Sequence, residues 1–118
     1  MNQRPVAVRE EHPFARWAEK NWTEDEKMEF IDHIARHPMA GAIIPDTGGV
    51  RKIRWFGSGR GKRGGARIIY YFYNATLPVF LLTAYAKNDQ ANLDAAGKSA
   101  MRKLIATMKH DFRNKSGA

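Results

Sequence analysis

The chain has 118 residues, of which 43% are hydrophobic and 27% are charged. This length and balance are typical of one small globular domain and exclude a two-domain enzyme or a disordered segment. The absence of cysteine excludes a disulfide framework, a zinc ribbon and a cysteine nucleophile. We therefore expect a single domain over residues 1–118, with its core over about residues 12–112.

The first third of the chain predicts two helices. Pro13 suits the first turn of a helix, and apolar side chains follow at helical spacing as far as Asn21. Thr23 and Glu26 have the spacing of a capping box, which opens a second helix. Pro38 ends that second helix, because proline cannot continue it.

The middle third predicts strands, over residues 50–56, 66–73 and 79–86. The first of them alternates, with Ile53 and Trp55 on one face and Lys52 and Arg54 on the other. The second is rich in β-branched and aromatic residues, and the third is almost entirely apolar, which is typical of an interior strand. Short connections between consecutive strands favour an antiparallel β-meander.

The last third predicts one helix from about residue 94, followed by a frayed tail. Its apolar stripe consists of Met101, Leu104, Ile105, Met108 and Phe112. A further short strand at residues 42–44 or near the N-terminus has a weaker signal. The predicted fold class is α+β: two N-terminal helices, an antiparallel β-meander and a C-terminal helix.

Charge is distributed unevenly along the chain. Twenty Lys and Arg against twelve Asp and Glu give a net charge of +8. Residues 47–88 contain eight basic and no acidic side chains, whereas residues 1–49 contain six basic and nine acidic ones. A concentration of this kind attracts nucleic acid or an acidic protein partner. The alternative is a solvated basic face that only keeps the protein soluble.

Residues 59–64 match the pattern G-x-G-x-x-G of dinucleotide-binding loops. That function requires a helix to begin directly after the loop, and here a predicted strand follows, so we reject it. Two interpretations stay open for this segment. One is a flexible hairpin loop, and the other is a loop that wraps phosphates with backbone N–H groups and cationic side chains.

The sequence predicts neither a metal site nor a cofactor. His33 and His37 have the i, i+4 spacing of helical zinc ligands, but no pattern for a third ligand accompanies them. No apolar run approaches the length of a membrane span, and the start of the chain shows no signal peptide. We therefore expect a cytoplasmic protein with no membrane contact.

The strand cations predict a phosphate site. Lys52 and Arg54 share a face, Arg67 begins the next strand and Lys87 ends the third, so a meander can bring all four to one side of the sheet. Repulsion among cations lowers the pKa of a lysine held between them, which suits a general base. Arginines grip phosphate in a bidentate manner. These groups could promote attack of an RNA 2′-hydroxyl on its phosphodiester without a metal, or they could bind phosphate without catalysis.

The runs over residues 48–55, 61–71 and 81–88, in this order, strongly resemble the RelE/ParE superfamily of toxins. They are most similar to the HigB-like, RelE-type branch of bacterial type II toxin–antitoxin systems. The resemblance implies a compact RelE-like fold and metal-independent, ribosome-dependent cleavage of mRNA by 2′-hydroxyl attack. It also implies inhibition of translation.

The resemblance also implies roles for residues. Lys52 and Arg54 match strand cations near the scissile phosphate, with Lys52 the first choice for the base, and Arg67 matches an arginine that stabilises the transition state. Lys87 falls where the family has another catalytic cation. The expected contacts to ribosomal RNA or flanking mRNA are Arg51, Arg60, Lys62, Arg63 and Asn88. Tyr85 and His110 are candidates for base stacking or acid–base work, although neither clearly matches the aromatic or histidine of the family.

The resemblance finally implies partners. These are the ribosome, mRNA and a cognate antitoxin, usually a helix-turn-helix protein, through which the complex binds operator DNA. Two other functions stay open. One is inhibition of DNA gyrase, as in the ParE branch, and the other is a basic nucleic-acid-binding module without catalysis.

Overall fold

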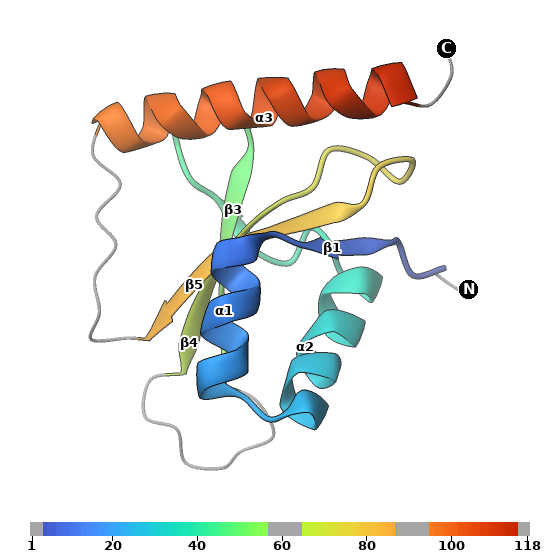
Figure 1. The fold of residues 1–118 in the computed structure, drawn as a ribbon, viewed down its shortest axis with the longest axis vertical. Helices are drawn as coiled ribbons and strands as arrows, with labels where there is room; N and C mark the ends of the chain where they lie inside the picture. Colours follow the sequence, from blue (N-terminus) through green and yellow to red (C-terminus); the bar gives the residue numbers. More distant parts are fainter. Residues whose placement is uncertain (1–3, 57–64, 87–94, 116–118) are drawn as a thin grey trace.

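A computed structural model describes residues 4–56, 65–86 and 95–115. These ranges contain three helices and five strands (Figure 1). In chain order they are β1 (Val8–Glu10), α1 (His12–Asn21), α2 (Glu24–Arg36), β2 (Ala42–Ile43), β3 (Val50–Trp55), β4 (Ala66–Tyr71), β5 (Val79–Ala86) and α3 (Ala95–Lys115). The predicted α+β class and the predicted order of helices and meander strands are confirmed.

The strands form one mixed sheet in the order β1-β5-β4-β3-β2. Strands β2 to β5 pair antiparallel with their neighbours, while β1 pairs parallel with β5. The meander is therefore extended at both edges, by a strand at each of the two places where a weaker strand signal was noted, residues 42–44 and the N-terminal region. Both edge strands are short, which limits the exposed backbone available for unwanted pairing.

Helices cover both faces of the sheet and create two hydrophobic clusters. On one face α1 and α2 pack against the sheet, with Phe14 and Phe30 buried against Ile68 and Tyr70. On the other face Ile105 of α3 joins a second cluster, which includes Val50, Ile69, Tyr71 and Phe80. Figure 1 shows α3 crossing one end of the sheet, so it covers only part of that face.

The local signals of α2 are confirmed. The Thr23 N–H donates to Glu26 Oε1 at 2.8 Å, and the Glu26 N–H donates to Thr23 Oγ1 at 3.1 Å. This capping box satisfies two N–H groups that the first turn of a helix leaves unpaired. The helix ends at Arg36, two residues before Pro38, with His37 as its C-cap.

The apolar stripe of α3 is narrower than predicted. Ile105 is buried and Met101 and Met108 pack beside it, but Leu104 is 46% exposed, so its placement in the core was wrong. A helix that rests on a sheet along one line buries only the residues on that line, and Leu104 lies to its side. The side chain of Phe112 lies outside the described residues.

Polar contacts fix the position of α3 along the sheet. The guanidinium of Arg102 donates to the carbonyl of Asp46, just before β3. Lys109 Nζ lies 4.1 Å from the centroid of the Tyr73 ring, just after β4. Helix α3 therefore lies at the end of the sheet where β3 begins and β4 ends. In the described part of the chain, none of the helices is long and apolar enough to cross a membrane.

His33 gives the fold a predicted pH dependence. Burial lowers the pKa of His33, charge on His37 lowers it further, and Asp32 opposes both. The unfolded chain therefore takes up this proton at a higher pH than the folded protein does. Folding stability is lost as the pH falls through the unfolded value of about 6.5 towards the lower folded value. We expect the free energy of unfolding, measured with urea, to be lower at about pH 5.5 than at about pH 7.5.

The variant His33→Gln is expected to reduce this difference between the two pH values. His12→Gln is the matched control, because His12 is exposed at the start of α1. An unchanged pH dependence in His33→Gln would show that other groups cause it.

Candidate functional site

Strand β3 presents two cations to one face of the sheet. Lys52 and Arg54 are exposed, whereas Val50, on the same face, is buried under α3. Ile53 and Trp55 point to the opposite face and pack against the cluster beneath α1 and α2. The predicted alternation of β3 is therefore confirmed, and its cations lie on the α3 side of the sheet.

The pairing of three strands brings further side chains beside these cations. Arg54 is the register partner of Arg67 on β4, and Arg67 is the partner of Tyr85 on β5. Lys52 lies two residues before Arg54 on the same face of β3, and its register partner is Ile69. Directly opposed side chains have Cβ atoms about 5 Å apart. We call Lys52, Arg54 and Arg67 the cationic row, and Tyr85 adjoins it.

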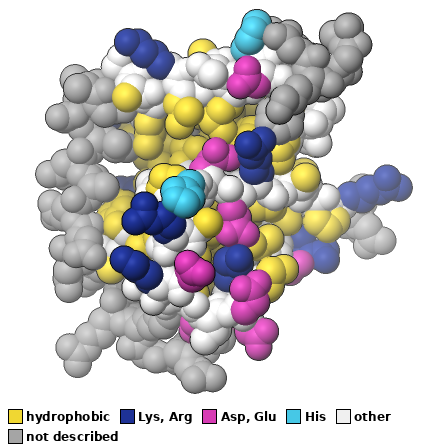
Figure 2. All heavy atoms as spheres, in the orientation of Figure 1, with side chains coloured by type: hydrophobic (Ala, Val, Ile, Leu, Met, Phe, Trp, Pro, Cys, Tyr) yellow, Lys and Arg dark blue, Asp and Glu magenta, His cyan; other side chains and the backbone are white. Residues whose placement is uncertain are grey.

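The electrostatics of the cationic row favour an anionic ligand. Arg54 and Arg67 are directly opposed across two strands, an arrangement of like charges that destabilises a sheet. Neither β3, β4 nor β5 contains an acidic residue. The exposed acidic side chains of α2 lie on the other side of the sheet, and on the face in Figure 2 acidic and basic side chains are interspersed. A phosphate group bound between the two arginines would relieve their repulsion.

The two arginines of the cationic row lie at the end of the sheet away from α3. The buried contacts of α3 are with Val50 at the start of β3, Tyr71 at the end of β4 and Phe80 near the start of β5. Arg54 and Arg67 lie at the opposite ends of their strands, each four residues away, whereas Lys52 lies two residues from Val50. In Figure 1, β5 likewise ends away from α3. The two arginines are therefore separated from the buried contacts of α3 along the strands.

Phe56 is a candidate site residue that the sequence interpretation missed. Its side chain is 49% exposed, and the Arg54 Cζ lies 5.3 Å from the centroid of its ring. An exposed aromatic ring beside an arginine that is a candidate for phosphate binding offers a surface on which a nucleobase could stack. The sequence pattern that could have indicated Phe56 is the alternation of β3, because Phe56 continues the two-residue spacing of Lys52 and Arg54.

Arg51 is placed apart from the cationic row. It points to the face covered by α2, where its Nη1 donates to the carbonyl of Gly41 at 2.7 Å and to that of Met39 at 3.3 Å. These bonds hold the segment between α2 and β2. Arg51 therefore makes a structural contact on the face opposite the cationic row. This placement does not support its predicted contact with RNA.

Of the remaining predicted site residues, the structure describes two, Tyr85 and His110. Tyr85 is partly buried beside Arg67, as part of the cluster under α3. His110 lies next to Lys109, which contacts Tyr73 beyond the far end of β4, so the structure does not bring it to the cationic row. Outside the described residues are Arg60, Lys62, Arg63, Lys87 and Asn88.

Across residues 4–56, 65–86 and 95–115, no three potential metal ligands gather in one place. The rings of His33 and His37 do lie close together, with centroids 5.1 Å apart. His33 also packs on Trp55, at a centroid distance of 4.8 Å. This pair is thus part of the packing between α2 and β3.

Comparison with known families identifies the family of this chain. A family model described as the RelE toxin of the RelE / RelB toxin–antitoxin system matches residues 7–116. The chain belongs to the RelE toxin family. The match extends a few residues beyond the predicted core at both ends, and it includes β1 through α3.

Membership of the RelE toxin family confirms the resemblance seen in the sequence. This RelE-type protein is the toxin of a toxin–antitoxin system, and it has a cognate antitoxin as partner. Its assignment to the HigB-like branch stays a prediction.

Proposed function

We propose that this RelE-family toxin is an endoribonuclease that cleaves mRNA on the ribosome and so inhibits translation. The observation that supports the proposal is the cationic row, in which Arg54 and Arg67 are register partners at the end of the sheet away from α3. Paired arginines match the geometry of a phosphodiester. The requirement for a ribosome is supported by the family alone.

The proposed reaction is attack of a ribose 2′-oxygen on the adjacent phosphorus. A base removes the 2′-hydroxyl proton as the new O–P bond forms. The bond from phosphorus to the 5′-oxygen then breaks, and the leaving oxygen takes up a proton. The products are a 2′,3′-cyclic phosphate and a 5′-hydroxyl end. No metal is needed in this scheme, because cationic side chains stabilise the charge that develops on the phosphoryl oxygens.

Roles follow from position in the cationic row. Arg54 and Arg67 would hold the two non-bridging phosphoryl oxygens. Lys52, the third cation on that face, is our first choice for the base. Phe56 and Tyr85 would hold the neighbouring bases by stacking, since one adjoins Arg54 and the other Arg67. Lys87 remains a proposed catalytic cation from the family motif.

The test is cleavage of a defined mRNA on purified ribosomes by the refolded toxin. We expect discrete breaks inside translated codons, with 2′,3′-cyclic phosphate and 5′-hydroxyl ends. A 2′-deoxy nucleotide at the cleaved position should block the break. A phosphorothioate there should slow it, and Mn²⁺ should not restore the rate.

Other outcomes would overturn the proposal. Intact mRNA together with DNA damage after induction would indicate inhibition of gyrase. Salt-dependent RNA binding without any break would indicate a nucleic-acid-binding module.

A further inference from the structure

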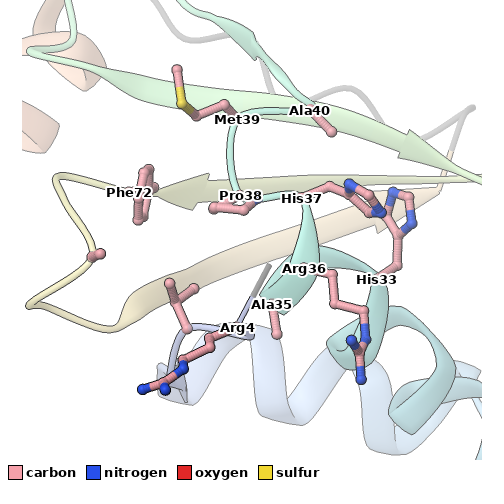
Figure 3. Close-up of a pocket in the computed structure, with 11 residues that line it drawn as sticks. Arg4, His33, Ala35, Arg36, His37, Pro38, Met39, Ala40 and Phe72 are labelled. Atoms are coloured by element: carbon pink, nitrogen blue, oxygen red, sulfur yellow. The ribbon is translucent and has the colours of Figure 1, made fainter. Parts of the chain in front are cut away.

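A hollow of about 740 Å³ lies on the side of the sheet opposite the cationic row. Figure 3 shows it between the N-terminal segment, the C-terminal end of α2 and the chain that follows the end of β4. Its apolar lining includes Val6, Ala35, Pro38 and Phe72. Phe72 packs against the cluster beneath α1 and α2, which fixes the face on which the hollow opens.

The other lining side chains are mostly basic. Arg4, Arg36, His33 and His37 contribute to the lining, and among the residues that the structure describes no carboxylate does. Asp32 forms an ion pair with Arg36, with 3.0 Å between Arg36 Nε and Asp32 Oδ1. An apolar hollow with a basic lining is complementary to an apolar segment that carries carboxylates at its flanks.

The walls of the hollow are held in place by hydrogen bonds. The Gly41 N–H donates to Tyr70 Oη at 2.7 Å, and Arg51 Nη1 donates to the Gly41 carbonyl at 2.7 Å. The Val6 N–H donates to the carbonyl of Ala35 at 2.9 Å, which fixes the N-terminal segment against α2. A preformed hollow requires little ordering when a partner binds.

Exposed apolar side chains lie next to the hollow. Met39 lines it and is 65% exposed, and Ile43 on the adjacent edge strand β2 is 55% exposed. Large apolar side chains exposed near a concave surface are typical of a protein interaction site. The family provides a dedicated protein partner, the antitoxin, for a toxin whose net charge is +8.

We propose that this hollow receives an apolar segment of the cognate antitoxin that is flanked by carboxylates. The inference rests on family membership and on the lining of the hollow, and it does not require that the toxin cleave RNA. Because the hollow and the cationic row lie on opposite faces, the segment seated in the hollow does not itself contact the row. Antitoxin binding and catalysis are therefore separable by mutation.

The test is titration calorimetry of refolded toxin with the purified cognate antitoxin. Met39→Glu removes apolar surface and places a negative charge where the carboxylates of the antitoxin segment are expected to bind, so it should repel them. We expect the dissociation constant to rise about tenfold or more. Ala75→Glu, on another wall of the hollow, should act in the same direction. Leu104→Glu is the matched control, since Leu104 is 46% exposed on α3, on the other side of the sheet.

Activity provides an independent readout. Met39→Glu toxin should cleave mRNA on ribosomes at the wild-type rate, and its growth arrest should resist co-expressed antitoxin. Wild-type affinity in both hollow variants, or an equal loss in Leu104→Glu, would overturn the proposal. A toxin that is dimeric alone and becomes monomeric on Met39→Glu would assign the hollow to a second copy and would also overturn it. A failure of RNA cleavage in the wild type would leave the affinity comparison intact.

Discussion

Arg67→Ala is expected to reduce mRNA cleavage on ribosomes about 100- to 1,000-fold, the loss typical of removing one group that stabilises transition-state charge. Arg67 lies between Arg54 and Tyr85 in the register of the three strands, so its removal opens the middle of the proposed site. The measurement is the rate of cleavage of a reporter mRNA by refolded variant, together with growth after induction in cells.

The fold should survive this substitution. Removing one charge from a directly opposed pair relieves repulsion, so we expect thermal unfolding close to that of the wild type. Arg67→Lys keeps the charge but loses the planar fork of donors, and it should have intermediate activity. Arg16→Ala is the control, because Arg16 is an exposed cation on α1. Full activity in Arg67→Ala would disprove the site assignment.

Features set by neighbouring residues could be predicted from the sequence. The capping box of Thr23 and Glu26 depends on a spacing of three residues, and the shared face of Lys52 and Arg54 depends on the two-residue repeat of a strand. The same two-residue repeat places Arg51 on the opposite face. The prediction of an RNA contact for Arg51 relied instead on its position in a run of cations. Charge composition indicates affinity for an anion but does not indicate the face on which a side chain lies.

Features set by pairing between distant segments could only be found in the structure. The register of three strands places Arg54, Arg67 and Tyr85 side by side. An irregularity in β5, opposite Ile69 and Tyr70, shifts this register. Strand β1 has three residues and pairs with β5, about seventy residues away, so it has no periodic pattern of its own. The hollow combines side chains from three separate stretches of the chain, and no sequence motif indicates it.

Phe30→Ala is expected to lower the free energy of unfolding by about 3–5 kcal/mol, the usual cost of removing a large aromatic side chain from a core. Phe30 is fully buried, and its ring contacts those of Phe14, Trp22 and Trp55 at centroid distances of 6.2, 5.6 and 5.4 Å. The total free energy of unfolding of a small domain is typically only about 5–15 kcal/mol. Urea denaturation followed by tryptophan fluorescence measures the change.

Met28→Ala is the matched control, because Met28 lies on the same helix and is 50% exposed. Its substitution should change stability by no more than about 0.5 kcal/mol. Phe30 packs on the face of the sheet opposite the cationic row, so cleavage per folded molecule should stay at the wild-type value under conditions where Phe30→Ala is folded. A lower rate per folded molecule would show that the packing of Phe30 on Trp55 positions Arg54, the residue that precedes Trp55 in β3. Stability and catalysis would then depend on the same strand, whereas the geometry predicts that its two faces act separately.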